Sequence, residues 1–455
     1  MKIRGQKKKI IGAFLATSLV CVGFGLQPAS AASSASATTS VSASAIAKAM
    51  NTPTTLTYWT WVPGLNKEIA LFEKRYPKIK VNAINVGQGG PHYQKLRVGA
   101  TSGKGLPDLA QIEFQYVPAF TQIGLLANIA PYVSKTFKSK FEAWTISQVS
   151  GPKGAIYGVP QDTGPMGMLY RADIFTKYGI AVPKTWDDFA AAAAKLHAAD
   201  PTVYLANFGP NEADVATSFG WQAGSRPFKS LGNNAYKINV DDPAAQKIAK
   251  YWADLVSAGT VSTDPAWNND WFAGFDKGKY ATWLTGAWGP LFLAGQAKDT
   301  AGLWRAAPLP QWSAGASVSG NRGGSSTAVI KGTKNPIAAA TFAEFLNSDP
   351  VSTPLLSQAP QLLFPASSAA LHAPAFINAK VAFFGGQQAN KVFVAINKTV
   401  AKDFAWSPFT DQVYQELQND VGTAITGKTD VLAALATEQT NILKYAVDQG
   451  FTVSK

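Results

Sequence analysis

The sequence predicts an α/β fold, because strand-like and helix-like segments alternate through most of its 455 residues. Its length is the second observation, since a chain this long exceeds what one hydrophobic core usually holds, and two lobes are therefore expected. Hydrophobic residues make up 46% of the chain, which is enough for two cores. Charged residues make up only 15%, against about 25% in an average soluble domain.

The N-terminus carries the features of an export signal. Basic residues between positions 2 and 9 precede an apolar stretch at 10–20, and Ala29-Ser30-Ala31 supplies the small residues that a signal peptidase accepts. The apolar stretch is too short for a lasting membrane span. We expect residues 1–31 to be a signal peptide and the mature protein to be extracellular, cell-surface-associated or periplasmic. Residues 32–53 are mostly Ala, Ser and Thr without an apolar period, and are predicted to be a linker.

Cys21, the only cysteine, lies within this signal. It is either discarded on cleavage or carries a lipid anchor, and the bulky Val20 before it favours the first interpretation because lipoprotein signals resemble Leu-Ala-Gly-Cys. Five of the basic residues and no acidic residue lie in 1–31, so the formal net charge of +13 falls to +8 after cleavage, and the remaining charge includes no dense Lys/Arg cluster. No nucleic-acid partner is therefore expected.

The folded body begins with a strand–helix–strand unit. Residues 55–60 are β-prone, apolar residues recur at helical spacing over 65–76, and Pro77 ends that helix. Strands are predicted at 79–84 and 109–112. This rhythm predicts a mostly parallel sheet covered by helices.

Several later helices have recognisable starts. Thr185 precedes two acidic residues in a first turn, while Asp242 and Asn335 each precede a proline. Gly259 is predicted to close the second of these helices. A C-terminal helix is predicted within 429–450, with its apolar face formed by Leu432, Leu435, Ile442 and Leu443.

Motifs of catalysis are not found. The three histidines, His92, His197 and His372, are far apart, and the chain contains no His-Glu-x-x-His, Gly-x-Ser-x-Gly or phosphate-loop pattern. We therefore predict no catalytic residue, no metal and no cofactor. Acidic residues are few but not absent, so their number leaves a glycosidase pair open.

Aromatic residues are the most abundant binding chemistry. Among the thirteen tryptophans, Trp61 follows the first predicted strand, and Trp221, Trp288 and Trp406 stand beside Gly, Ser or Pro. Sugars stack the C–H faces of their rings on aromatic side chains, and their hydroxyls need fixed hydrogen-bond partners. These loop aromatics favour a carbohydrate site. A lone tryptophan is more often a core residue, and that role is assigned to Trp186, Trp252 and Trp304, with Trp59 open to it as well.

Seven motifs in order resemble family 1 extracellular solute-binding proteins, the family that includes maltose-binding relatives. The most specific run reads Tyr-Gly-Val-Pro from 157, Leu-Tyr-Arg-Ala-Asp-Ile-Phe from 169 and Pro-Lys-Thr-Trp-Asp-Asp-Phe from 183, where the family has YGVP, LYYNKDLF and PKTWDEF. Residues 71–81, 105–109 and 124–132 match earlier steps, and later motifs continue the order. Arg171 and Tyr280 depart from the family pattern, which has Asn and a small residue there.

The resemblance implies a bilobal, type II periplasmic-binding-protein-like fold of two α/β lobes joined by about three hinge crossings. The crossings are expected near 159–161, 308–311 and 363–365. Lobe one would hold 54–160 with 311–363, and lobe two 161–310 with 364–455.

The resemblance also implies a monomeric binding protein that is not an enzyme. It would bind a carbohydrate, in particular an oligosaccharide, between the lobes and deliver it to the transmembrane permease subunits of an ABC importer. The predicted ligand-binding residues are Trp61, Glu113, Gln115, Tyr116, Asp162, Trp221, Trp288, Arg322 and Trp406. Two alternatives stay open, a secreted carbohydrate-active enzyme and the same fold binding a phosphate ester, iron chelate or polyamine.

Overall fold

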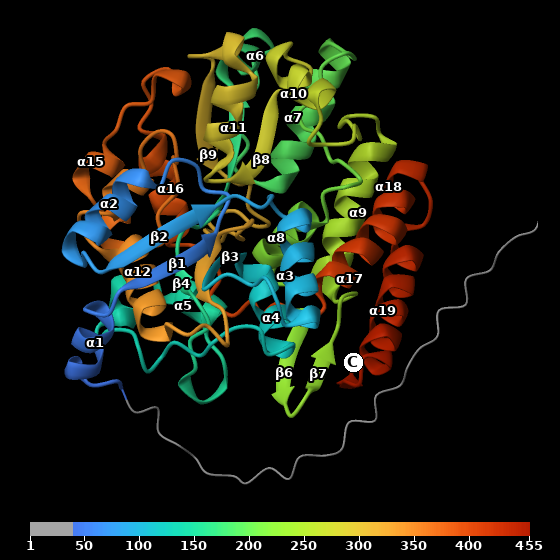
Figure 1. The fold of residues 1–455 in the computed structure, drawn as a ribbon. Coiled ribbons are helices and arrows are strands. Elements are labelled where there is room, and N and C mark those ends of the chain that lie inside the picture. The colour runs from blue at the N-terminus through green and yellow to red at the C-terminus, as the bar shows by residue number, and fades with distance from the viewer. Residues whose placement is uncertain (1–39) are drawn as a thin grey trace, which may run out of the picture. The chain divides into compact units, whose positions relative to one another are not determined.

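A computed structural model describes residues 40–455 of the chain (Figure 1). The predicted signal peptide, Cys21 and the first part of the predicted linker lie outside the described residues. None of the helices within 40–455 is long and apolar enough to cross a membrane.

Helix α1 (Ala43–Met50) corrects the end of the predicted linker. The Ser42 side chain caps it by accepting a hydrogen bond from the amide of Ala45, and alanine has the highest helix propensity of any residue. Met50 is buried in the core beneath the first sheet. The folded body thus starts before residue 54. The sequence did not indicate this helix because its alanine-rich composition shows no obvious apolar stripe.

The first sheet has five strands in the order β2 (Ile79–Ile84), β1 (Thr54–Trp59), β3 (Leu109–Glu113), β10 (Ser325–Val329) and β4 (Val159–Pro160). Strand β1 runs parallel to β2 and β3, which confirms the three strands predicted from the sequence. Strand β10 runs antiparallel to both β3 and β4. Helices α2 (Asn66–Arg75) and α12 (Pro336–Ser348) pack beside each other, and their side chains join the core of this sheet.

The remaining strands form two smaller sheets. One has the order β8 (Thr282–Gly286), β5 (Met166–Arg171), β9 (Trp304–Pro308), and the other has β11 (Thr452–Ser454), β7 (Ala235–Ile238), β6 (Phe228–Gly232). Five of the eight strand pairings described are antiparallel. Outside β2-β1-β3 and the β11-β7 pair, the predicted mostly parallel pairing is therefore wrong. Spacing and composition show where strands lie and not which way a returning strand runs.

The predicted helix starts are confirmed. Thr185 and Asp188 form a reciprocal capping box at the start of α7 (Trp186–Ala199), and the Asp242 side chain accepts from the amide of Ala245 at the start of α9 (Pro243–Ser257). Helix α19 (Val431–Asp448) is capped by Asp430. On its predicted apolar face Leu435 and Ile442 are buried, whereas Leu432 is exposed.

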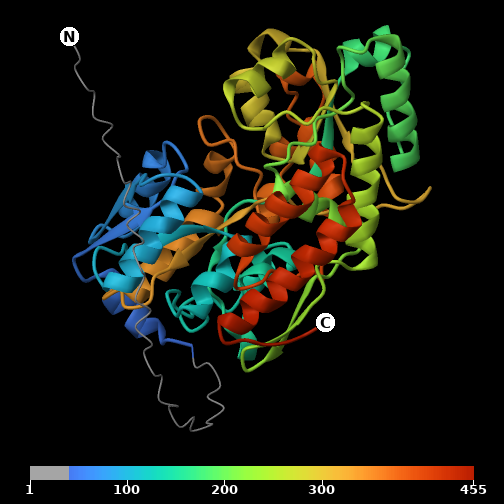
Figure 2. The same ribbon diagram turned by 90° about the vertical axis from the view of Figure 1, so that its right-hand side faces the viewer.

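The remaining α-helices are short connections around the sheets. They are α3 (Gly90–Ser102), α4 (Val117–Gln122), α5 (Ala143–Val149), α6 (Ala172–Lys177), α8 (Ala213–Ala223), α10 (Asn269–Asp276), α11 (Gly289–Gln296), α13 (Thr353–Leu356), α14 (Ser368–Leu371), α15 (Pro374–Ile377), α16 (Ala389–Asn397), α17 (Thr410–Glu416) and α18 (Thr423–Gly427). In Figures 1 and 2 the blue elements around β1 and β2 form one group, and the green and yellow elements around β8 and α7 form another.

Separate hydrophobic clusters underlie these groups. One lies beneath the first sheet and includes Phe72 and Phe342, whereas a second gathers around α7, α8 and α9. Trp186, Trp252 and Trp304 are buried, which confirms that they are core residues.

Candidate functional site

A cavity of about 730 Å³ lies where the strands of the first sheet end. Trp61 follows β1, Glu113 ends β3, Asp162 follows β4, and Ser325 begins the antiparallel β10, so all four come to the same edge of the sheet. Ligands of α/β sheets bind at this edge. The volume lies within the range of about 300–1,000 Å³ that is usual for small-molecule sites.

Aromatic side chains from two sources line this cavity. Trp61 belongs to the first-sheet side and packs edge-on against the buried His92, with ring centroids 5.0 Å apart. Burial lowers the pKa of His92 to about 4, so its ring is neutral at pH 7. Trp267 precedes α10 and Trp288 follows β8; their ring centroids are 5.9 Å apart and their planes are inclined by 36°. Phe292 of α11 extends this second aromatic surface.

Buried hydrogen-bonding groups lie between these aromatic surfaces. The Tyr93 hydroxyl donates to the Glu113 carboxylate at 2.8 Å and accepts from the Glu113 amide at 3.0 Å. The Asp162 carboxylate accepts from the amide of Ser325 at 2.8 Å. Gln115 is buried, and within residues 40–455 its side-chain oxygen has no hydrogen-bond partner. The cavity therefore presents fixed acceptors to the hydroxyl donors of a ligand.

Burial raises the pKa of two cavity carboxyls, Glu113 and Asp162. For Glu113 the value is raised to about 7, with the charges of Asp214 and Asp162 as smaller causes. For Asp162 the pKa is raised to about 6, although the hydrogen bonds of Ser325 oppose the rise. With these pKa values both groups take up protons in the neutral to weakly acidic range.

Gln111 fixes the loop that carries Trp61. Its side-chain oxygen accepts from the Thr60 hydroxyl at 2.8 Å and from the Trp61 amide at 3.2 Å, while its nitrogen donates to the Ser325 hydroxyl at 3.1 Å. One buried amide therefore joins the loop after β1 to the start of β10.

Two glycines allow the close approach of Trp288. The indole N–H of Trp288 donates to the carbonyl oxygen of Arg322 at 2.9 Å. A Cβ atom at Gly286 would lie 2.6 Å from the indole nitrogen, and one at Gly164 would lie 1.8 Å from the Arg322 oxygen. Any larger residue at these positions would displace the indole.

Five of the nine predicted site residues line the cavity, namely Trp61, Glu113, Gln115, Asp162 and Trp288. Tyr116 is not among the lining residues, and its ring lies 4.1 Å from that of Tyr93, whose hydroxyl contacts Glu113. Arg322 is 1% exposed and forms ion pairs with Glu212 at 2.8 Å and Asp214 at 2.6 Å. The roles of all seven predicted site residues named here in binding ligand stay predictions.

The placement of Trp221 and Trp406 at the cavity is wrong. Trp221 is fully buried on α8, where it stacks on Phe404 at 4.3 Å and donates to the Ala401 carbonyl at 2.8 Å. Trp406 is also buried and donates to the side chain of Gln148 at 2.8 Å. The glycine beside Trp221 indicates a loop in the sequence, but Gly220 lies inside α8. Trp406 does lie in a loop, as predicted, and there its side chain belongs to the core.

Trp267, Asp214 and Phe292 line the cavity and were not predicted. Trp267 is 41% exposed and has φ +69°, a left-handed conformation that bulky residues rarely adopt. Such strain is concentrated at functional positions. Its sequence context, Pro-Ala-Trp-Asn-Asn, is a loop pattern of the kind that singled out the other tryptophans. No motif marks Asp214 or Phe292.

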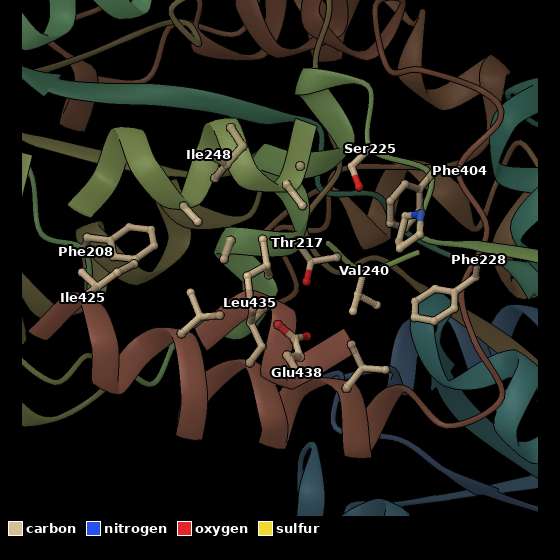
Figure 3. A pocket seen from close by; sticks show the side chains of 18 residues that line it. Phe208, Thr217, Ser225, Phe228, Val240, Ile248, Phe404, Ile425, Leu435 and Glu438 are labelled. Atoms are coloured by element: carbon tan, nitrogen blue, oxygen red, sulfur yellow. The ribbon is translucent and has the colours of Figure 1, made fainter. Parts of the chain in front are cut away.

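A second, smaller cavity of about 80 Å³ lies among α8, α9 and the C-terminal helices (Figure 3). Apolar side chains such as Ile248 and Leu435 line most of it, together with Glu438. Glu438 is 1% exposed, and one of its oxygens has no hydrogen-bond partner in the described part of the chain. This cavity is too small for a sugar.

We expect the buried Glu438 to make the stability of the protein depend on pH. Burial, followed by the charges of Asp420, Glu416 and Asp241, raises its pKa well above the usual value. The stabilisation from its protonated form is complete below the unfolded pKa of about 4.3 and is lost as pH rises towards the folded pKa. We expect Glu438→Gln to gain stability relative to wild type as pH rises, by up to about 1.4 kcal/mol per pH unit.

Urea denaturation between pH 5 and 9 measures this gain. The exposed Asp448→Asn variant is the control, and its difference from wild type should stay constant with pH. If the difference in unfolding free energy between Glu438→Gln and wild type also stayed constant with pH, the raised pKa of Glu438 would be contradicted.

No group of three or more His, Cys, Asp or Glu side chains that could hold a metal ion occurs within residues 40–455. The cavity is lined by aromatic, carboxyl and amide groups, which suit an organic, hydroxyl-rich ligand.

Comparison with protein families identifies a match over most of the chain. The model of the bacterial extracellular solute-binding protein family matches residues 58–352. The arabinooligosaccharide-binding protein of Bacillus subtilis is 26% identical over 306 residues, which cover 64% of this chain and 69% of that protein. The lactose-binding protein of Rhizobium radiobacter is 26% identical over 302 residues, covering 63% of this chain and 69% of that protein.

Solved structures with the same fold include two from bifidobacteria. An ABC transporter associated binding protein from B. animalis subsp. lactis, in complex with β-1,6-galactobiose, has a TM-score of 0.77 and 32% identity, covering 89% of this chain and 100% of that one. The galacto-N-biose/lacto-N-biose I-binding protein of Bifidobacterium longum, in complex with lacto-N-biose, has a TM-score of 0.76 and 28% identity, covering 88% and 98%. These similarities confirm the predicted bilobal α/β fold, whereas the positions of the hinge crossings stay predictions.

Proposed function

Because this chain belongs to the bacterial extracellular solute-binding protein family, we propose that it captures a short oligosaccharide in the cavity beside Trp61, Trp267 and Trp288. Like the other members of this family, it is a binding protein and not an enzyme. The sugar would then pass to the transmembrane subunits of an ABC importer. The observation that carries the proposal is one cavity that combines aromatic faces with buried, oriented hydrogen-bond acceptors.

The lining of the cavity favours an uncharged sugar over an anionic solute. Glu113, Asp162 and Asp214 line it, and no lysine or arginine does so in the described part of the chain. The charge of the nearby Arg322 is matched by its two acidic partners. The ionisable groups that a phosphate ester would meet in this lining are all acidic, which weakens that alternative.

The similar proteins narrow the sugars worth testing. Their names or complexes specify arabinooligosaccharides, lactose, β-1,6-galactobiose and lacto-N-biose, all of which are uncharged saccharides. We propose that the ligand belongs to this class of neutral short saccharides.

Tryptophan fluorescence tests the proposal. The mature protein is titrated with these four saccharides and with maltose, and the sugar is recovered afterwards for chromatography. We expect a saturable change at micromolar concentration with at least one sugar, recovered unchanged. No saturable response to any of them would contradict carbohydrate binding.

An acidic sugar should bind poorly at neutral pH. If lactose binds, we expect lactobionate, which carries a carboxylate, to bind at least about tenfold more weakly at pH 8 because the cavity carboxylates repel it. The difference in affinity between lactose and lactobionate should be smaller at pH 5.5. At that pH Asp162 and Glu113, with pKa values raised to about 6 and about 7, are mostly protonated. Calorimetry at both pH values measures it, and equal affinities at pH 8 would contradict the role of the carboxyls.

A further inference from the structure

Arg322 lies directly behind the cavity, between two acidic residues of the α8 region. Its Nε donates to Asp214 at 2.6 Å and its Nη2 donates to Glu212 at 2.8 Å. Arg322 is 1% exposed, whereas the side chain of Asp214 is 36% exposed and faces the cavity. Burial alone would lower the pKa of Arg322, but the charges of Asp214 and Glu212 raise it above its ordinary value. The guanidinium therefore stays charged and fixes a carboxylate that a ligand can reach.

The same guanidinium lies against both tryptophans of the second aromatic surface. Its carbon is 5.1 Å from the ring centroid of Trp288 and 5.5 Å from that of Trp267. A cation at this distance from the face of an indole is attracted by the negative face of the ring. The planar group also matches ring faces and carboxylates in a way that a lysine cannot.

The backbone of Arg322 adds two further connections. Its carbonyl oxygen accepts from the Trp288 indole at 2.9 Å, and its amide donates to the Gly164 carbonyl at 2.8 Å. Gly164 is two residues beyond Asp162, so one residue contacts the aromatic surface, the α8 acids and the segment that carries a cavity carboxyl.

The conformation of Trp267 requires stabilising contacts from its neighbours. It is 41% exposed and has a left-handed backbone conformation. A strained conformation persists only when its surroundings over-determine it. The guanidinium and the neighbouring aromatic rings supply those surroundings.

We propose that Arg322 is a positioning residue, which sets the orientation of Trp267, Trp288 and Asp214 for the ligand without touching the ligand itself. This inference deepens the function proposed above and rests on it for its effect on affinity. It replaces direct ligand contact, the role that sequence analysis predicted for Arg322.

Near-UV circular dichroism of the sugar-free protein tests the positioning itself. The difference spectrum between wild type and Trp267→Phe reports the environment of that indole. We expect it to lose at least half its intensity when both proteins also carry Arg322→Gln. Arg171→Gln is the matched control, because Arg171 is likewise buried, paired with Asp173 at 2.7 Å and 5.9 Å from the Trp304 ring, away from the cavity.

Sugar affinity tests the consequence. We expect Arg322→Gln to bind sugar at least tenfold more weakly, with Arg171→Gln unchanged. Trp267→Ala should weaken binding strongly in wild type and by less than threefold in the Arg322→Gln background, because the indole there is already displaced. Additive losses, or a retained difference spectrum, would overturn the proposal.

Two further variants test the proposal in case Arg322→Gln alone fails to fold. Arg322→Lys keeps the charge between the acids, and Arg322→Gln with Glu212→Gln removes one charge of each sign. Both should show the weakened dichroism and affinity while remaining folded by far-UV circular dichroism. If wild type binds none of the sugars, the proposed function fails, while the dichroism still decides the role of Arg322.

Discussion

Replacing Trp288 with alanine is expected to weaken sugar binding by about 30- to 1,000-fold, which corresponds to about 2–4 kcal/mol. Trp288 lines the cavity, and its indole is held by a hydrogen bond to Arg322 and by edge contacts with Trp283 and Phe292. A rigid, pre-oriented ring binds without losing conformational freedom, so its removal takes away both contact area and preorganisation. Calorimetry with the sugar identified by fluorescence measures the loss.

Trp221→Phe is the control for this measurement. Trp221 lies in the core and not at the cavity, so the folded variant should keep its affinity within about twofold. Unchanged affinity in Trp288→Ala would remove Trp288 from the site and with it the aromatic surface on which the proposed function depends.

Much of the fold could be predicted because it is encoded locally. The capping box of Thr185 and Asp188 and the apolar spacing over 65–76 depend only on neighbouring residues, and both gave the right helices. Strand direction is not local. Strand β10 enters the first sheet more than two hundred residues after β3, and nothing within its own five residues indicates that it runs antiparallel.

The site was predictable to the extent that its residues follow strands. Trp61, Glu113 and Asp162 come directly after or at the end of strands of one sheet, and strand ends converge at one edge. Asp214 and Phe292 reach the cavity from helices, where tertiary packing alone decides which side chain faces it.

Trp221 and Trp267 illustrate the limit of composition as a guide. Both stand near residues that favour loops, yet Trp221 packs inside α8 against Phe404 while Trp267 is held at the cavity in a left-handed conformation. The difference lies in what surrounds each indole, which a pattern of neighbouring residues does not contain.

Replacing Trp221 with alanine is expected to lower the free energy of unfolding by about 3–5 kcal/mol, the usual cost of removing a large buried aromatic side chain. The indole stacks on Phe404 with planes inclined by 9°, meets Trp144 and Trp406 edge-on, and donates to the Ala401 carbonyl. Alanine would leave a void and an unpaired carbonyl, whereas Trp221→Phe keeps part of the stacking and should cost less.

Urea denaturation followed by far-UV circular dichroism measures this loss, and sugar titration of the folded fraction accompanies it. The structure requires stability to fall while the affinity of the folded protein persists, because Trp221 is fully buried away from the cavity. The opposite outcome, full stability with lost affinity, would return Trp221 to the ligand as the sequence alone predicted. Since the two placements give opposite results in one variant, this measurement separates a core tryptophan from a ligand-stacking one.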